Sequence, residues 1–344
     1  MIHELKQIVD SAIRNQKSGI KNALATVVDL DGSSYRQPGV RMLLSDNGSM
    51  VGAVSGGCVE KEVLKRAQSV FKTGKSKVIT YDGRYRLGCE GVLYILIEPF
   101  YISDAFKTAF FKNLESRKPI NVQSYFKKED NCIGAFYSEV IFEDNNIFTF
   151  FSENETDTLE KSGLKIFKET LSPCFKLLII GGEHDAVKLC KMGSLLGWEV
   201  DVVTSVKDPK QHQDFPGAKS VSSNTPETFV VEGVDTECAV VLMTHNYAQD
   251  LRYLLKLKAS APSYIGVLGS AKRREQLHND LLDYTADLDT DFLDKIHSPA
   301  GLNIGAITPE EIALSILSEI LAINRNKDPH SLNTITGKIH LKPE

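Results

Sequence analysis

Apolar residues at the start of the chain recur at the spacing of an amphipathic helix. Leu5, Ile8, Val9 and Ala12 share one face, and Gly19 follows as the expected stop. Short β-rich runs come next, separated by clusters of Gly, Ser, Asp and Pro. They are ALATVVD from Ala23, VRMLL from Val40, MVGAV from Met50, KVITY from Lys77 and VLYILIEP from Val92.

One amphipathic helix interrupts these strands. It is predicted from about Cys58 to Thr73, with Gly74 as its end. From Tyr101 to about Leu171 the pattern weakens into charged and aromatic residues. Strands are expected there near residues 120–125, 132–142 and 147–151. Pro173 precedes a new apolar run, so the domain boundary is predicted near residue 172, after a mixed α+β domain of residues 1–171.

Beyond this boundary, strands alternate with helices. The strands are KLLIIGG, WEVDVVT, CAVVLMTH and YIGVLGS. A closing helix is signalled by Thr308 as N-cap, Pro309 at its first position and Glu310 and Glu311 in its first turn. The fold class is therefore α/β: the mixed domain is followed by a Rossmann-like, doubly wound parallel sheet over residues 172–325 and a tail of residues 326–344.

The composition and net charge argue against nucleic acid and membranes as partners. The 344 residues are 42% hydrophobic and 25% charged, with a formal net charge of −5, which gives no overall attraction to nucleic acid or anionic membrane. The start of the chain lacks a signal-peptide pattern, and no apolar run approaches the roughly 18 residues that span a bilayer. We expect a cytoplasmic protein without nucleic-acid or membrane partners, and a homodimer on the base rate of soluble oligomers. The six cysteines lack CxxC pairing and indicate reduced thiols.

The first strand of the second domain ends in an imperfect dinucleotide fingerprint, IIGGEHDA. Gly181 fills the first glycine position and Gly182 a free one, but Glu183 stands at the second glycine, where a carboxylate would repel pyrophosphate. Thr204 stands where an acidic residue would bind ribose hydroxyls. Two interpretations stay open: an NAD(P)-linked oxidoreductase, or a Rossmann-like domain without tight dinucleotide binding.

Two further strand ends reach the same expected rim of the sheet, where open α/β folds bind ligands. Glycine, serine and basic residues that open a helix suit an anion such as phosphate. The alternatives are a capping role for His245 and a solvated helix face for the basic residues. The candidate residues are Thr244, His245, Asn246, Gly269, Ser270, Lys272 and Arg273.

The stretch VSGGCVE places a thiol at the predicted start of the first-domain helix. Gly57 is the expected N-cap, Cys58 the first helical residue and Glu60 the third. A thiol at a helix N-terminus is biased toward thiolate, and Gly56 and Gly57 leave room for a bulky ligand. The alternative is a small buried cysteine. Cys89, in RLGCEG, could approach Cys58, which would allow a thiol redox enzyme.

The loop DLDGSSYRQPGVRMLL is the remaining polar cluster of the first domain. Ser33, Ser34 and Arg41 could cradle a phosphate or carboxylate, or the segment could be an ordinary hairpin with capping serines. His, Cys, Asp and Glu nowhere show the spacing of a zinc site. The sequence also lacks a GxSxG nucleophile elbow and a GxxxxGK[ST] phosphate loop.

Several of these motifs together, in this order, resemble the XdhC/CoxI family of molybdenum-enzyme maturation factors. In the first domain they are GSSYRQPGVRMLL, GAVSGGCVE and LGCEGVLYILIEP; in the second they are LLIIGGEHDA, VVLMTHNYAQD, YIGVLGSAKRR and SPAGLNIGAITPEEIALSILSEI. The resemblance implies an accessory protein rather than a catalyst. It would bind molybdenum cofactor, protect it, support its sulfuration with a cysteine desulfurase, and insert it into an apo-molybdoenzyme of the xanthine dehydrogenase type.

The resemblance also assigns roles to residues of the first domain. Cys58 would lie beside the metal or sulfur, with Cys89 in the same cofactor site. Ser33, Ser34 and Arg41 would face the pterin or phosphate. Two departures from the family pattern, Glu183 and Thr204, affect the second domain, although His184 matches it. The loop around the thiol would be shaped by Ser55, Gly56, Gly57 and Glu60.

Overall fold

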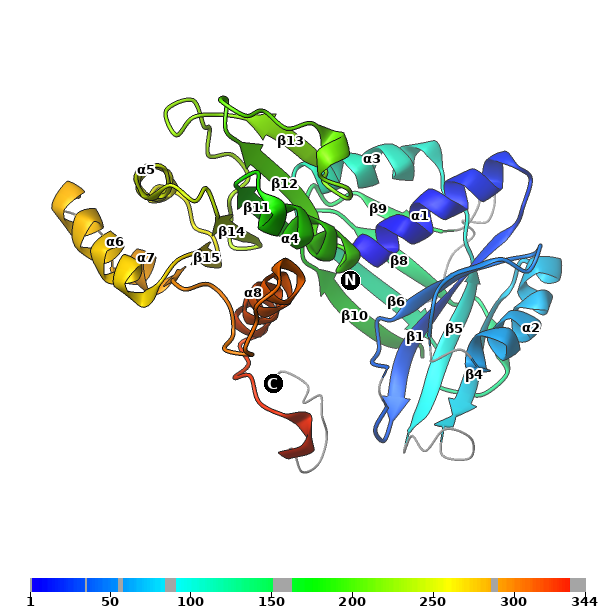
Figure 1. Cartoon of the computed structure of the whole chain (residues 1–344). Coiled ribbons are helices and arrows are strands. Elements are labelled where there is room, and N and C mark those ends of the chain that lie inside the picture. The colour runs from blue at the N-terminus through cyan, green and yellow to red at the C-terminus, as the bar shows by residue number, and fades with distance from the viewer. Residues whose placement is uncertain are drawn as a thin grey trace. The chain divides into compact units, whose positions relative to one another are not determined.

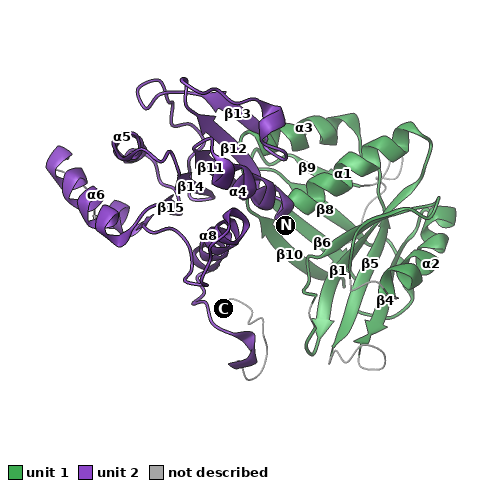
Figure 2. Ribbon diagram, in the orientation of Figure 1, with its two compact units in different colours: residues 1–173 green, residues 174–344 purple. Residues whose placement is uncertain are grey.

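The computed structural model describes residues 2–34, 36–54, 58–83, 91–150, 163–285 and 290–334. The chain forms two compact units, residues 1–173 and 174–344 (Figure 2). The N-terminal unit is built on antiparallel strands and the C-terminal unit on parallel strands. The predicted fold class is thereby confirmed.

The first sheet of the N-terminal unit has the strand order β3-β2-β1-β5-β4-β7. All its pairs are antiparallel, and a bulge between Val27 and Asp29 shifts the register of β1 against β5. The helix α1 (Ile2–Lys17) precedes this sheet. The strands are β1 (Asn22–Asp31), β2 (Arg41–Ser45), β3 (Met50–Gly52), β4 (Ser76–Asp82), β5 (Val92–Pro99) and β7 (Cys132–Gly134).

Helix α2 (Cys58–Thr73) covers one face of this sheet, as predicted for residues 58–73 (Figure 1). Its apolar side, which includes Val63, Ala67 and Val70, packs on alternate residues of β1 and β5, such as Val27 and Ile95. Because side chains alternate across a strand, Val28 and Leu96 point to the opposite face. There they meet two phenylalanines of the second sheet region. Phe126 is the last residue of one strand of the second sheet, and Phe136 directly precedes another.

The second sheet of this unit is antiparallel, with the order β10-β6-β8-β9. Helix α3 (Asp104–Glu115) begins at its N-cap Ser103 and buries Phe106 and Phe110. The ring of Phe106 meets those of Phe142 and Phe150. Neither α3 nor the last strand was predicted from the sequence. The strands are β6 (Ile120–Phe126), β8 (Tyr137–Ile141), β9 (Ile147–Thr149) and β10 (Lys165–Leu171).

The C-terminal unit holds one parallel sheet with the order β13-β12-β11-β14-β15-β16. The first strand in sequence lies at the centre, and the chain winds outward from it in both directions, which is the Rossmann arrangement. The strands are β11 (Lys176–Ile180), β12 (Glu199–Thr204), β13 (Ser220–Ser223), β14 (Cys238–Leu242), β15 (Tyr264–Val267) and β16 (Ile296–His297).

Helices pack on both faces of this sheet (Figure 1). One face is covered by α4 (His184–Leu195) and α8 (Pro309–Asn324), the other by α5 (Tyr247–Leu257) and α6 (Ala271–Tyr284). The start of α8 follows the sequence prediction: Thr308 and Glu311 form a reciprocal capping box, with Pro309 in the first turn. The remaining elements are the 3₁₀ turns η2 (His212–Asp214) and η3 (Leu332–Thr334) and the helix α7 (Thr290–Asp294). No helix among the described residues is long and apolar enough to cross a bilayer.

A buried carboxyl group joins the two sheets of the N-terminal unit. Glu98, on β5, is fully buried. It accepts hydrogen bonds from the backbone N–H of Ser138 at 2.8 Å and from its hydroxyl at 2.6 Å. The Ser138 hydroxyl also lies 2.8 Å from that of Ser124. Burial raises the pKa of Glu98 to about 7, against the opposing effects of the Ser138 bonds and the charge of Arg41.

This carboxyl predicts a pH dependence of stability. Its folded pKa exceeds the ordinary value of 4.5, so the folded state binds the additional proton between about pH 4.5 and 7, and stability falls as pH rises through this window. Glu98→Gln removes the titration; its amide oxygen can still accept from the Ser138 N–H, and its NH₂ group can donate to the Ser138 hydroxyl, which can donate in turn to Ser124. We expect it to stabilise unit 1 relative to wild type by about 2 kcal/mol more at pH 8 than at pH 4.

Urea unfolding at both pH values measures the effect. Trp198, the only tryptophan of the chain, reports unit 2, whose transition should not change, whereas the far-UV signal includes unit 1. The exposed Glu143→Gln is the matched control. An equal pH dependence in wild type and Glu98→Gln would contradict a titrating Glu98.

Candidate functional site

The first candidate region is one end of the first sheet in unit 1. Asp31 of β1 and Asp82 of β4 both pair with Val92 at the start of β5, so three strand ends lie side by side. At the other end of the sheet, the ammonium of Lys21 lies 3.5 Å from the carbonyl of Phe71, near the end of α2. The first turn of α2 therefore points toward the end where β1 finishes.

Two of the sequence motifs meet at this end. A Cβ atom built on Gly91 would lie 2.6 Å from the carbonyl oxygen of Ser33 and 2.8 Å from the side chain of Leu30. Gly91 also accepts a backbone hydrogen bond from Gly83 at 3.0 Å. Only glycine fits this close approach of two chain segments. The structure thus brings the loop of Ser33 and Ser34 against the end of the RLGCEG segment.

Arg41 is buried beside this loop and has a partner within the protein. Its guanidinium forms an ion pair with Glu169 of β10 and donates to the carbonyl of Gly39 at 3.0 Å. A Cβ atom on Gly39 would approach the Glu169 carboxylate to 2.6 Å. An anion could bind the Arg41 guanidinium only in competition with Glu169, so the geometry favours a positioning role for Arg41.

Charge at the end of β1 is largely compensated. The ammonium of Lys128 lies 3.1 Å from Asp29, forms an ion pair with Asp31, and sits 4.6 Å from the ring centre of Tyr94. The hydrogen bond from Lys128 is the main cause that lowers the pKa of Asp31. This arrangement limits the repulsion that an anionic ligand would meet at the neighbouring loop.

Part of the predicted first-domain site lies outside the described residues. These positions are Ser55, Gly56, Gly57 and Cys89. Of Cys58 only the backbone is described, as the first residue of α2, and the approach of Cys58 to Cys89 stays untested. Glu60, in the same first turn, is buried. Within the described part of the chain, no group of three or more His, Cys, Asp or Glu side chains is arranged to hold a metal ion.

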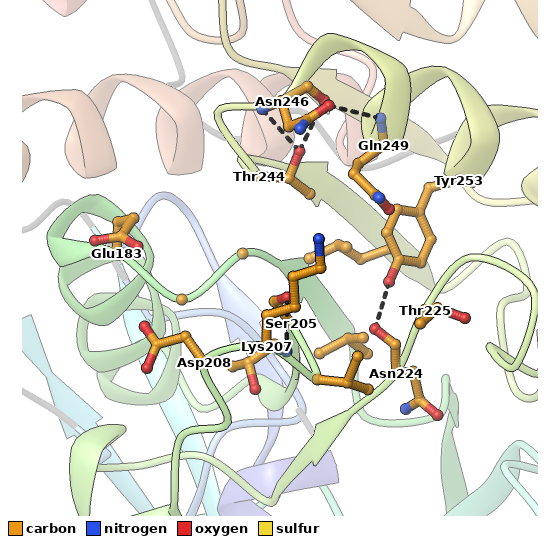
Figure 3. A pocket seen from close by; sticks show the side chains of 16 residues that line it. Glu183, Ser205, Lys207, Asp208, Asn224, Thr225, Thr244, Asn246, Gln249 and Tyr253 are labelled. Carbon is orange, nitrogen blue, oxygen red and sulfur yellow. Dashed lines mark hydrogen bonds between the residues drawn. The ribbon is translucent and has the colours of Figure 1, made fainter.

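The second candidate region is a pocket of about 240 Å³ in unit 2 (Figure 3). It lies at the carboxyl ends of β11, β12, β13 and β14, where the strand order reverses and where open α/β sheets bind ligands. Its walls come from the loops after these strands and from α5. The lining residues are Ile180, Gly181, Gly182, Glu183, Val203, Thr204, Ser205, Val206, Lys207, Asp208, Asn224, Thr225, Thr244, Asn246, Gln249 and Tyr253.

The two glycines of the β11–α4 loop have different physical roles. A Cβ atom on Gly181 would lie 2.4 Å from the carbonyl oxygen of Met243, so glycine is required for the close packing of this loop on the end of β14. A Cβ atom on Gly182 would make only ordinary contacts, the nearest with Lys210 and Thr204 at 3.6 Å. The packing of the protein would therefore tolerate a Cβ atom at Gly182, unlike at Gly181.

Glu183 is the N-cap residue of α4 and is exposed at the pocket. Its backbone is extended, with φ −88°, so the position does not need glycine for conformational reasons. Its carboxylate makes no capping bond to the helix and stands where the helix amides would otherwise receive a phosphate. His184, the first residue of α4, is also exposed.

Thr204 is buried at the end of β12, with its hydroxyl already bonded. The hydroxyl lies 2.9 Å from that of Ser223 and accepts from the backbone N–H of Lys210 at 3.3 Å. A ribose hydroxyl would thus find neither a carboxylate nor an uncommitted acceptor on Thr204.

The predicted residues after β14 divide into two groups. Thr244 and Asn246 line the pocket, and Asn246 also caps α5. His245 is exposed, takes a left-handed backbone conformation with φ 54° and is not a lining residue. Thr244 donates to Asp250 at 2.6 Å. Burial raises the pKa of Asp250, against the opposing effects of Thr244 and Arg273.

The predicted residues after β15 support α6 rather than line the pocket. Ser270 is the N-cap of α6, and Gly269 lies close to the side chain of Arg273. Arg273 forms an ion pair with the buried Asp250, while Lys272 is exposed. The contacts from Arg273 to Asp250 and on to Thr244 link this region to the pocket.

Sequence reasoning did not single out several lining residues. Lys207 and Asp208 follow β12, Asn224 follows β13, and Gln249 and Tyr253 belong to α5. The position of each loop after a parallel strand was the available signal. The buried Glu98 was missed too, although a lone carboxylate in the apolar run VLYILIEP is unusual.

The fold and the pocket define a class of protein: an antiparallel α+β unit joined to a Rossmann-like unit whose dinucleotide fingerprint is altered at its second glycine. Residues 16–82 match the XdhC and CoxI family, and residues 177–320 match the XdhC Rossmann domain. The chain belongs to the XdhC and CoxI family.

Relatives and a solved structure resemble the chain over nearly its whole length. A probable xanthine dehydrogenase subunit of Bacillus subtilis is 26% identical, over 91% of this chain and 96% of the relative. The molybdenum cofactor insertion chaperone PaoD of Escherichia coli is 23% identical, over 95% and 91%. A crystal structure of a xanthine dehydrogenase from Bacillus halodurans has the same fold, with a TM-score of 0.74 and 24% identity over 93% and 96%.

Glu183 gives a direct test of the altered fingerprint. Glu183→Gly removes the carboxylate from the start of α4 and should tighten binding of reduced nicotinamide dinucleotides by at least about tenfold, because the phosphate repulsion disappears. Glu183→Gln, which keeps the bulk and removes the charge, should give an intermediate affinity. Fluorescence titration of the bound nicotinamide measures both. Unchanged affinity in both variants would show that Glu183 does not oppose phosphate.

Proposed function

We propose that this protein is a molybdenum cofactor insertion chaperone for a xanthine dehydrogenase-type enzyme. The observation that carries the proposal is the match, over 95% of this chain, to a relative named as such a chaperone. A second relative is named as part of a xanthine dehydrogenase, which supports the same class of client enzyme. The cofactor is then a cargo that the protein binds and passes on.

The cargo site is assigned to the end of the first sheet in unit 1. The cofactor is a phosphorylated pyranopterin dithiolene, so it needs donors for its phosphate and room beside its metal. Ser33 and Ser34 lie in a loop held against Gly91, and α2 begins at Cys58 and points its first turn toward this end. Backbone amides at a helix start suit an anion, and a thiolate there suits a metal.

Individual roles follow from this assignment. Cys58 lies beside the metal or its sulfur, and Ser55, Gly56, Gly57 and Cys89 complete the loops around it. Arg41 acts indirectly: its ion pair with Glu169 holds the loop of Ser33 against the second sheet. Glu60 is buried in the first turn of α2 and supports the start of the helix.

The proposal also covers protection and sulfuration of the cofactor, the cellular location and the oligomeric state. The protein shields the bound cofactor, supports exchange of an oxo for a sulfido ligand with a cysteine desulfurase, and works as a cytoplasmic homodimer. An NAD(P)-linked oxidoreductase fits less well, because Glu183 opposes the pyrophosphate of either dinucleotide and Thr204 offers no carboxylate to the ribose hydroxyls of NAD.

Binding of molybdenum cofactor tests the proposal. Purified full-length protein is incubated anaerobically with the cofactor, and the bound molybdenum and pterin are quantified per chain. Wild type should bind in near-stoichiometric amounts. Cys58→Ser should weaken binding at least about tenfold, because a serine hydroxyl stays protonated and cannot supply the thiolate that binds a metal.

The matched control is Cys132→Ser, in a half-buried cysteine of β7 in the same unit. It should bind cofactor like wild type. A second readout is activation of apo-xanthine dehydrogenase by the loaded protein. Absence of binding by folded wild type would reject the proposal. Equal binding by wild type and Cys58→Ser would show that the metal does not bind beside Cys58.

A further inference from the structure

We propose that the pocket of unit 2 is a nucleotide site that selects a ribose carrying a 2′-phosphate. This inference concerns unit 2 alone and does not depend on the cargo site of unit 1. It rests on the shape of the pocket, the residue at the end of β12, and a lysine that reaches into the pocket from the next loop.

The pocket has a volume of about 240 Å³ and lies where this fold binds nucleotides. It spans the ends of β13, β12 and β11 and reaches the end of β14 across the switch point, where this fold receives a nucleotide. Tyr253 forms part of the wall; it is buried and its hydroxyl donates to the carbonyl of Asn224 at 3.0 Å. Asn224, Thr225 and Gln249 also line the pocket. The Asn224 amide donates to the Ser222 hydroxyl and the Thr225 hydroxyl is bonded to that of Thr228, so the amide of Gln249 is the group best placed to bond a base.

The residue at the end of β12, where a ribose would bind, is neutral. A carboxylate at the end of β12 binds the 2′- and 3′-hydroxyls of an unphosphorylated ribose and repels a 2′-phosphate. Here that position is Thr204, whose hydroxyl is bonded within the protein. The feature that normally excludes a 2′-phosphate is therefore absent from this position.

A cation stands beside the ribose position. Lys207 lines the pocket, and its side chain extends from the loop after β12 into the space below α5 (Figure 3). The neighbouring Lys210 is paired with Asp208 at 2.6 Å, whereas no ion pair within the described residues involves Lys207. Ser205 turns this loop by accepting from the backbone N–H of Lys207 at 3.2 Å. A lysine and a hydroxyl here suit a phosphate monoester.

Glu183 determines which phosphate group of the ligand contributes most to the binding affinity. Its carboxylate opposes a phosphate at the start of α4, so a bound pyrophosphate contributes little affinity. Discrimination between nucleotides then depends on the group that reaches Lys207. A 2′-phosphate is favoured over a free 2′-hydroxyl by charge attraction, and the preference should weaken with added salt.

Calorimetric titration of the full-length protein with adenosine 2′,5′-bisphosphate and with AMP tests the proposal. Wild type should bind the bisphosphate at least about tenfold more tightly. Lys207→Gln should remove most of this difference and leave the affinity for AMP nearly unchanged, and Lys207→Arg should keep it. Lys219→Gln, at an exposed lysine just before β13 and outside the pocket lining, is the matched control and should behave like wild type.

Three outcomes would overturn the proposal. They are equal affinities of wild type for the two nucleotides, no binding of either at millimolar concentration by folded protein, and displacement of the bisphosphate by equimolar inorganic phosphate. The last outcome would show a general anion site without a nucleoside pocket. NADPH and NADH, titrated in parallel, should follow the same order of affinity.

Discussion

The architecture of unit 1 depends on two ionisable groups that are buried between its sheets. Arg41 of the first sheet pairs with Glu169 of the second, and Glu98 of the first accepts two hydrogen bonds from Ser138 of the second. A buried charge without a partner is strongly unfavourable, so each contact restricts how the sheets can slide or separate. The Ser33 loop leads into β2 at Arg41, so the ion pair of Arg41 with Glu169 also holds the end of this loop.

In unit 2, the scaffold and the ligand site are formed by different parts of the chain: the sheet and its helices form the scaffold, and the loops form the site. Its apolar strands are covered by helices on both faces, so polar side chains concentrate in the loops at the strand ends. Substitutions in these loops change the chemistry of the pocket while the sheet persists. Glu183 and Thr204 depart from the dinucleotide fingerprint in this way, and both affect the charge that a ligand meets rather than the fold.

Local patterns predicted the elements well where one face is apolar and the ends are marked. Helix α2 and the capped start of α8 are confirmed, and so is the doubly wound sheet. Helix α3 was missed because Ala105 and Phe111 blur the stripe formed by Phe106 and Phe110. The contacts of Glu98 and Arg41 cross 40 and 128 residues of sequence, and a residue pattern carries no information about such pairs. Lys207 could not be singled out from the sequence, because only the fold shows that its loop lines a pocket.

The contact between Gly181 and the Met243 carbonyl bears on how glycine motifs are interpreted. A glycine that packing demands will persist in any descendant that keeps the sheet, whether or not a ligand is ever bound. The second glycine position is under no such demand here, because its backbone is extended and accepts Glu183. The two positions therefore carry different information: glycine at the first is a property of the scaffold, whereas the residue at the second is free to differ with the ligand.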